Sequence, residues 1–348
     1  MVGAVVPESG ALAPLVADYR KALLLWQDEV NAAGGLLGRR VELRLLDDGS
    51  VAVRAGPLYA TLIKEHKADL LIGPYGSAAT LLALAEAERS RRVMMNAAGP
   101  AHTVHKRSPQ YVFQSVAPYS AYAAGILQLA NAAGCKSLFV LARDDAASVE
   151  MAEGTGATAE IYPGSTSDFA PLVAKARAAN AGAWIAFGEV QDSAAMVISF
   201  KRQGYVPPLF FASAATQPKF RTLVGQDAER SFGVIRYDAR FATPSNTKFV
   251  AAFAKRWADK PGAAGAESYA AATVLAEAVR RAGTLDQQKL RAALAALETE
   301  TVLGWYKVNP ANGEQVGIKP AVAQIVKGRP EIVWPVALKS AEANIKCH

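Results

Sequence analysis

The stretch that decides the fold is Leu70-Leu-Ile-Gly-Pro-Tyr-Gly-Ser77-Ala-Ala-Thr80-Leu-Leu-Ala-Leu-Ala-Glu-Ala-Glu-Arg89. Its first three residues, 70–72, form a short apolar run that is bounded by glycine and proline, which predicts a buried strand. A loop containing Gly76 follows, and the alanines and leucines of residues 81–89 predict a helix. A strand, a short loop and a helix in this order form the repeating unit of a parallel sheet covered by helices on both faces.

The same alternation continues on both sides of this stretch. Strands are predicted at residues 2–6, 41–46 and 93–96, with helices at 14–33 and 53–65. A second series comprises a helix ending near 129, strands at 137–141, 159–161, 183–187 and 209–211, and helices at 169–179 and 192–202. It is followed by a strand at 233–237, helices at 247–258, 267–282 and 286–296, and a β-rich stretch at 304–308 and 322–326. The predicted fold is therefore α/β, with two lobes that each carry a parallel central sheet.

The composition is typical of a globular protein. The chain has 348 residues, more than one domain usually needs, and 51% of them are hydrophobic and 20% charged. No apolar run reaches the roughly 18 residues needed to cross a bilayer. Residues 1–6 resemble a buried strand with no basic or long apolar segment before it, so we expect that any export signal is missing from this sequence.

The net charge of +7 raises the question of a nucleic-acid partner. The basic residues are scattered, however, and usually have acids nearby, as in residues 64–67 and 227–230. A solvated basic surface is therefore the better interpretation, and no nucleic-acid partner is predicted.

The common catalytic and cofactor motifs are absent or poorly placed. No Gly-x-Ser-x-Gly elbow or Walker loop occurs, and Gly154-Thr-Gly156 follows an acidic segment where a dinucleotide-binding fingerprint requires a strand. The acid pairs at 47–48 and 144–145 end predicted strands, where we expect them to cap helices or turns. The sequence therefore predicts no catalytic residue, no enzyme activity and no cofactor.

Histidines and cysteines are too few for the usual metal sites. The four histidines are His66, His102, His105 and His348. His102 and His105 lie in a polar loop and are expected at the surface, so no metal ligand is predicted. Cys135 and Cys347 could form one disulfide in an oxidising compartment, but the sequence does not give their separation in space, so the pairing stays open.

Three stretches, met in order along the chain, point to a family. The first is Ser9-Gly-Ala-Leu-Ala13 with the later Glu29-Val-Asn-Ala-Ala-Gly-Gly-Leu-Leu-Gly-Arg39, and the second is Leu71-Ile-Gly-Pro-Tyr-Gly-Ser77-Ala-Ala-Thr80. The third is Tyr162-Pro-Gly-Ser-Thr-Ser-Asp-Phe169, followed by Phe200-Lys-Arg-Gln-Gly204. Together they resemble the type I periplasmic binding proteins, in particular the leucine/isoleucine/valine-binding subgroup, over almost the whole chain.

This resemblance implies two Rossmann-like lobes joined by a three-strand hinge, with the ligand held in the cleft between them. The crossovers are expected near residues 115–118, 237–241 and 327–333. Lobe 1 would combine residues 1–116 with 241–328, and lobe 2 would combine 117–240 with 329–348. The resemblance also implies an exported, periplasmic protein that acts as a monomer and delivers its ligand to the permease of an ABC importer.

General physics gives the same site, because ligands of open parallel sheets bind beyond the carboxyl ends of the strands. Among the loops there, Gly76 would let the backbone approach a ligand, and Ser77 would offer a hydroxyl and an amide at a helix start, which suits a carboxylate. The alternative is that Ser77 is a plain helix N-cap. With the resemblance, the predicted ligand-binding residues are Leu15, Tyr75, Gly76, Ser77, Ala98, Gly99, Pro100, Arg143, Asp145, Phe187, Glu189 and Ser213.

Departures from the family pattern argue against an amino-acid ligand. Pro100 has neither hydroxyl nor N–H, Leu15 replaces an aromatic residue, and Ser213 replaces the acid that would meet an ammonium group. Glu189 could supply that charge, so an amino acid remains an alternative. The segment between residues 145 and 159 is about ten residues shorter than in relatives, so a full-length helix is expected to be missing and the cleft more open.

The leading hypothesis is thus a solute-binding protein that holds a small organic carboxylate, with an aromatic or apolar acid favoured. A branched-chain or other amino-acid binding protein is the first alternative. The second alternative keeps the fold but makes the chain the ligand-sensing domain of a receptor or regulator.

Overall fold

The computed structural model describes residues 1–347, and His348 lies outside the described residues. The chain forms two compact units, and it passes between them three times. Unit 1 consists of Met1–Pro118 and Tyr237–Ile318. Unit 2 consists of Tyr119–Arg236 and the chain from Lys319 onward.

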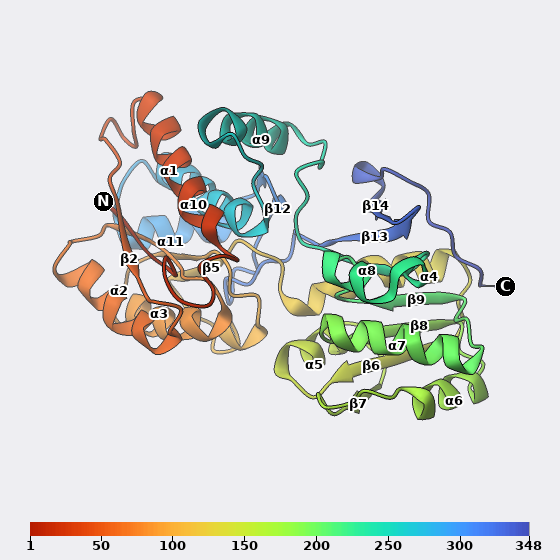
Figure 1. Ribbon diagram of the computed structural model, residues 1–348. Helices are drawn as coiled ribbons and strands as arrows, with labels where there is room; N and C mark the ends of the chain where they lie inside the picture. The colour runs from red at the N-terminus through yellow and green to blue at the C-terminus, as the bar shows by residue number, and fades with distance from the viewer. Residues whose placement is uncertain (348) are drawn as a thin grey trace. The chain divides into compact units, whose positions relative to one another are not determined.

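Unit 1 is built on a parallel sheet of five strands in the order β2-β1-β3-β4-β5. Figure 1 labels its two edge strands, β2 and β5. The elements of its first segment are β1 (Val2–Val6), α1 (Ala17–Ala32), β2 (Leu43–Asp47), the 3-10 turn η1 (Ala52–Arg54), α2 (Ala55–Lys64), β3 (Leu70–Ile72), α3 (Ser77–Arg89), β4 (Met94–Asn96), η2 (His102–Val104) and β5 (Val112–Gln114). The second segment adds α9 (Pro244–Trp257), α10 (Ala263–Ala282), α11 (Gln287–Ala296) and the hairpin of β11 (Thr299–Thr301) and β12 (Gly304–Tyr306).

The period-two alternation of β1 explains how this sheet is covered on both faces. Val2, Ala4 and Val6 belong to a core cluster with buried residues of α1, α10 and α11. Val5 points to the other face and joins a cluster with residues of α2 and α3. Successive side chains of a strand point to opposite faces, so a strand that is apolar throughout, as β1 is, needs helices on both.

Unit 2 is built on a sheet of seven strands in the order β14-β13-β10-β9-β8-β6-β7. Its first segment contains η3 (Tyr119–Ala123), α4 (Ala124–Ala132), β6 (Leu138–Arg143), α5 (Ala146–Glu153), β7 (Ala159–Tyr162), α6 (Ala170–Ala178), β8 (Ala183–Phe187), α7 (Val190–Gln203), β9 (Leu209–Ala212), α8 (Pro218–Val224), η4 (Gly225–Ala228) and β10 (Phe232–Ile235). The second contains β13 (Ala321–Val326), β14 (Arg329–Trp334) and η5 (Val336–Leu338). Strands β6 to β10 are mutually parallel, whereas β13 pairs antiparallel with both β10 and β14.

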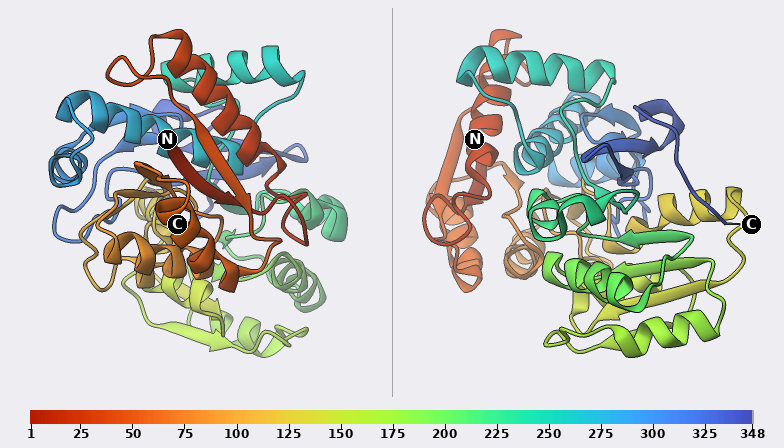
Figure 2. Two further views of the ribbon diagram at one scale, coloured as in Figure 1. Left: turned by 90° about the vertical axis from the view of Figure 1, so that its left-hand side faces the viewer. Right: turned by 45° about the vertical axis from the view of Figure 1, so that its right-hand side comes forward.

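The core of unit 2 follows the same alternation. Trp184 and Ala186 of β8 pack in one cluster with residues of α6, α7 and α8. Phe187 is turned away from that cluster and stacks edge-on against Phe211 of β9. Figure 2 turns the molecule so that the helices on the faces of each sheet can be followed. The predicted α/β fold with two lobes and parallel central sheets is confirmed.

One expected crossover is wrong. Residues 327–333 do not connect the units, because they form the turn and second strand of the β13–β14 hairpin inside unit 2. The chain instead changes unit between Ile318 and Lys319. The reason is that β13 completes the large sheet by antiparallel pairing with β10, so residues 321–326 belong to unit 2 rather than to lobe 1. The late β-rich stretch is likewise divided, with β12 in unit 1 and β13 in unit 2.

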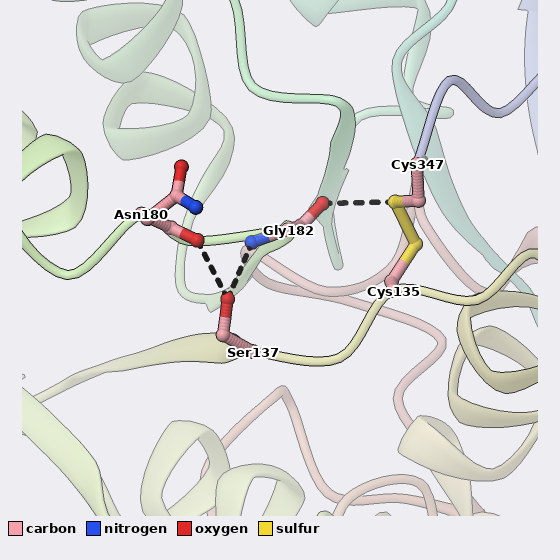
Figure 3. The surroundings of a disulfide bond; sticks show 5 residues. All are labelled: Cys135, Ser137, Asn180, Gly182 and Cys347. Atoms are coloured by element: carbon pink, nitrogen blue, oxygen red, sulfur yellow. Dashed lines mark hydrogen bonds between the residues drawn. A yellow bond between two sulfur atoms is a disulfide. The ribbon is translucent and has the colours of Figure 1, made fainter.

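A disulfide joins Cys135 and Cys347, with a Cα–Cα distance of 5.1 Å, and answers the question that the sequence left open (Figure 3). It attaches the last described residue to the loop between α4 and β6 within unit 2. Cys347 Sγ also lies 3.1 Å from the carbonyl of Gly182, and the Gly182 amide donates to Ser137 Oγ at 2.8 Å. Both cysteines are therefore used, and no free thiol is present among the described residues.

Among residues 1–347, no helix has both the length and the apolar composition that a membrane span requires.

Candidate ligand-binding site

The β3–α3 loop extends the pairing of β3 with β4 beyond the ends of these strands. Gly73 N donates to the Met95 carbonyl at 2.7 Å, and Gly76 N donates to the Ala98 carbonyl at 3.0 Å. Tyr75, which is half-buried, faces Ala98 in an isolated parallel bridge. Gly76 has a φ of +89°, a conformation that favours glycine, and it turns the chain directly into α3.

Helix α3 begins at Ser77, four residues earlier than predicted. Gly76 is the N-cap and no side chain caps the helix, so the interpretation of Ser77 as a plain N-cap is wrong. Ser77 Oγ instead accepts a hydrogen bond from Ala101 N at 3.1 Å and still carries its own proton. This hydroxyl is therefore next to the first amides of a helix, whose partial positive charge favours an anion.

The segment after β4 is held by buried polar side chains that the sequence did not reveal. Asn96 is fully buried and bonds to both sides of Gly99, with Nδ2 donating to the carbonyl and the Gly99 amide donating to Oδ1, each at 2.8 Å. Gln114 Nε2 also donates to the Gly99 carbonyl, at 3.2 Å. A side chain at Gly99 would meet Thr80 Oγ1 at 2.6 Å, so the close packing requires glycine.

At this end of the unit 1 sheet, two carbonyls are already used as acceptors, while the groups at the start of α3 are donors. The carbonyls of Ala98 and Gly99 already accept bonds from Gly76, Asn96 and Gln114. Pro100 is buried and has no N–H to offer. The Ser77 hydroxyl and the first-turn amides of α3 are donors, and donors at a helix start match a carboxylate better than an ammonium group.

Leu15 lies in the β1–α1 loop, and its side chain is 63% exposed. Asp47 anchors the start of this loop, accepting from Ser9 Oγ and from the amides of Glu8 and Ser9. These bonds, the one from the Ser9 hydroxyl foremost, lower the pKa of Asp47 below its usual value. Asp47 Oδ1 also accepts from Gly49 N, two residues on, at 2.8 Å, so the predicted turn role of this acid is confirmed.

The carboxyl ends of the unit 2 strands carry a cluster of charged and polar residues, here called the β6–β8 cluster: Arg143, Asp145, Tyr162, Glu189, Asp192 and Ser213. Arg143 Nη1 lies 3.4 Å from Asp192 Oδ2, and Arg143 Nε lies 3.7 Å from Asp145 Oδ2. Tyr162 Oη lies 3.3 Å from Asp192 Oδ2 and 3.2 Å from the Phe187 carbonyl. Burial, with Asp192 nearby, raises the pKa of Tyr162, which keeps its proton.

Asp145 and Glu189, both predicted ligand residues, also begin helices. Asp145 is the N-cap of α5 and accepts from Ser148 N at 2.9 Å, so the predicted cap role is confirmed. Glu189 is the N-cap of α7 and forms a reciprocal capping box with Asp192. The carboxylate of Glu189 thus accepts a backbone amide, although the residue is exposed.

The two remaining predicted residues of unit 2 differ in accessibility. Ser213 is half-buried, and its hydroxyl lies 3.2 Å from both the amide and the carbonyl of Gly188, so it joins the β8 and β9 ends. Phe187 is fully buried against Phe211, and its side chain is a core residue rather than a site wall. The sequence could not show this, because strand β8 is apolar at every position.

Segment 145–159 contains a short helix, the eight-residue α5, which Asp145 caps. The prediction that a full-length helix is missing there is not contradicted by a helix of this length. Asn96, Tyr162 and Asp192 were not predicted as site residues. Their signal was present, however, because Asn96 and Tyr162 end buried strands and Asp192 lies three residues after Glu189 in a capping-box pattern.

Both loop histidines were expected at the surface, which is correct for His102 and wrong for His105. His102 is exposed and lies 2.9 Å from Glu314 Oε1. His105 is fully buried, with Nε2 3.2 Å from Asn96 Nδ2 and Nδ1 2.8 Å from the Asn312 carbonyl. Within residues 1–347, no three His, Cys, Asp or Glu side chains gather as metal ligands would.

A cavity of about 330 Å³ lies elsewhere in unit 2, next to the amino ends of β9 and β10. It is lined by residues such as Phe200, Tyr205, Pro208 and Phe210, and it contains none of the predicted ligand residues. The loops beyond the carboxyl ends of the strands remain the better candidate, because that is where open parallel sheets bind ligands.

Residues 1–329 match the family described as periplasmic binding protein. A putative branched-chain amino acid ABC transporter from Silicibacter pomeroyi has 19% identity and a TM-score of 0.86, covering 99% of this chain and 98% of that chain. The branched-chain amino acid transporter substrate binding protein LivJ from Streptococcus pneumoniae, solved with isoleucine, has 19% identity and a TM-score of 0.72, covering 96% and 99%. A solute binding protein from R. palustris, solved with benzoate, has 20% identity and a TM-score of 0.71, covering 99% and 98%.

At these identities the solved structures demonstrate a shared fold, and the family match spans most of the sequence. The predicted resemblance to type I periplasmic binding proteins of the leucine/isoleucine/valine subgroup is confirmed. The chain belongs to the periplasmic binding protein family.

Proposed function

We propose that the protein is the periplasmic solute-binding component of an ABC importer, that it binds a small organic carboxylate, and that it catalyses no reaction. The observation that carries the ligand class is the start of α3, where the Ser77 hydroxyl adjoins helix amides that no side chain caps. The nearby carbonyls of Ala98 and Gly99 already accept hydrogen bonds within the protein. A carboxylate would accept hydrogen bonds from these donors. An ammonium group would instead compete for carbonyls that already accept hydrogen bonds within the protein.

An aromatic or apolar body on that carboxylate fits the neighbouring residues. Tyr75 is half-buried beside Ser77, Ala98 and Pro100 are buried, and Leu15 offers an exposed apolar side chain. The relative from R. palustris was solved with benzoate, which supports an aromatic acid as a ligand class for this fold. Ligand binding would shift the conformational equilibrium toward the state that the permease recognises.

An amino acid is the second candidate, and the β6–β8 cluster is the observation that favours it. Asp145, Glu189 and Asp192 surround the single guanidinium of Arg143, so acids outnumber bases there. Such a surplus would attract an ammonium group. The relative from Streptococcus pneumoniae was solved with isoleucine.

The periplasm is proposed as the compartment. The Cys135–Cys347 disulfide supports this, because disulfides persist in oxidising compartments and are rare in the cytosol.

A thermal-shift screen tests the proposed ligand class. Benzoate, 4-hydroxybenzoate and isovalerate should each be compared with leucine and isoleucine, with benzamide as the uncharged match to benzoate. A ligand at one hundred times its Kd stabilises the native state by about 2.7 kcal/mol, which raises Tm by several degrees. We expect benzoate or a related acid to raise Tm and benzamide to leave it unchanged. Shifts with the two amino acids only would reject the carboxylate proposal in favour of the second candidate.

A further inference from the structure

We propose that His105 and Asn96 are positioning residues, which set the 97–101 segment and, through Ala101, the Ser77 hydroxyl that receives the ligand. This inference rests on the proposed function. The path is a chain of hydrogen bonds from His105 to Asn96, from Asn96 to Gly99, and from Ala101 to Ser77. Neither residue needs to touch the ligand.

The orientation of the Asn96 amide is fixed by its two backbone partners. The Gly99 amide can only donate, so the atom facing it must be the oxygen Oδ1. The Gly99 carbonyl can only accept, so the atom facing it must be Nδ2. The second hydrogen of Nδ2 is then available to His105 Nε2, 3.2 Å away.

The same reasoning fixes the proton on His105. Nδ1 lies 2.8 Å from the carbonyl of Asn312, which only accepts, so Nδ1 carries the hydrogen. Nε2 faces the N–H of Asn96, so Nε2 must be the bare nitrogen that accepts. The network is therefore complete only when the imidazole is neutral and in the Nδ1–H form.

Protonation of His105 would break this network. A second hydrogen on Nε2 would face the hydrogen of Asn96 Nδ2, and two donors cannot satisfy each other in a site without solvent. The titratable groups around the ring are His102 of η2 and Glu314, which follows β12. Burial lowers the pKa of His105 below its usual value; the Asn312 bond and Glu314 oppose this effect, and His102 adds to it.

The Kd for the ligand is expected to depend on the protonation of His105. The usual histidine pKa is about 6.5, and that of His105 is lowered. His105 is therefore neutral at pH 7.5 and gains its second ring proton only at a lower pH. The ligand is expected to bind the neutral form, so Kd rises as the pH falls through the pKa of His105. By linkage, bound ligand must lower that pKa further by the same factor.

The test is the pH dependence of the Kd for benzoate between pH 7.5 and pH 5.0, measured by calorimetry. Wild type is compared with His105→Gln, because glutamine offers one donor and one acceptor but does not titrate. His66→Gln is the matched control, since His66 follows α2 in the same unit and has no contact with this network among the described hydrogen bonds. We expect wild type and His66→Gln to lose affinity as the pH falls through the pKa of His105, by about tenfold or more once the ring is protonated, as loss of one bond of 1–3 kcal/mol implies. The slope should vanish in His105→Gln.

Two outcomes overturn the inference. The first is a Kd for benzoate that does not change in wild type at a pH where nitrogen NMR shows that His105 is protonated, and the second is a slope that persists in His105→Gln. Nitrogen NMR of histidine-labelled protein adds a readout without ligand, and an Nε2–H form of His105 at pH 7.5 would also overturn it. If no carboxylate binds wild type at pH 7.5, the proposed function fails first, and the inference falls with it.

Discussion

At the scale of single residues, the ligand preference depends on which hydrogen-bonding groups the protein has already used. Ser77 keeps a proton to donate after accepting from Ala101, whereas the Gly99 carbonyl accepts from two side chains at once. A buried group without a partner costs about 1–3 kcal/mol, so a ligand must match the groups that remain. This comparison favours an anion at the α3 start without reference to any relative.

Glu189→Gln separates the two ligand candidates at this scale. The glutamine oxygen can still accept the backbone amide of the α7 capping box, so stability should change by less than about 1 kcal/mol. We expect the Kd for benzoate, measured by calorimetry, to stay the same or to fall when the negative charge is removed. A tenfold or larger loss of affinity for leucine in this variant would show that Glu189 holds an ammonium group, against the carboxylate proposal.

At the scale of elements, the apolar strands were predictable because burial on both faces leaves a continuous hydrophobic run, as in β1 and β8. The residues at which elements begin were harder to predict. Helix α3 begins four residues before the predicted one, because small residues such as Ala78 and Ala79 carry no periodic signal. Strand β5 was not predicted, and β14 was missed since Pro330 interrupts its pattern.

The site was predictable only in part, for a related reason. Loops beyond the strand ends could be located from the sequence, so the positions of Ser77, Gly99 and Arg143 in such loops were predictable, and their role in ligand binding stays a prediction. The direction of a side chain could not be predicted from the sequence. Phe187 was therefore predicted to contact the ligand, although its side chain packs in the core. Long-range partners such as Asn96 with His105 depend on how η2 folds back, which no local pattern encodes.

At the scale of the whole molecule, the order of the segments determines how strongly the disulfide can raise the free energy of unfolding. The chain leaves unit 2 at Arg236, builds the second part of unit 1, and returns at Lys319. Cys135 and Cys347 are 212 residues apart in sequence, so the bond closes a loop that includes segments of both units. Closing a long loop restricts the unfolded chain, which raises the free energy of unfolding.

Cys135→Ser should therefore lower the free energy of unfolding by roughly 2–4 kcal/mol. Denaturant titration followed by circular dichroism measures this change. Wild type treated with a reducing agent should show the same loss, while the variant should not respond to the reducing agent. Equal unfolding midpoints for oxidised and reduced wild type would contradict a stabilising role for this bond.

The central claim is that the start of α3 holds the ligand carboxylate, and calorimetric titration of Ser77→Ala with benzoate tests it most directly. Ser90→Ala, the same change at the other end of α3, is the control. A hydrogen bond to a charged group contributes about 1.5–3 kcal/mol, so the Kd of Ser77→Ala should rise roughly 10- to 150-fold while that of Ser90→Ala stays near the wild-type value. An unchanged Kd for Ser77→Ala, in a variant with the wild-type Tm, would contradict the account.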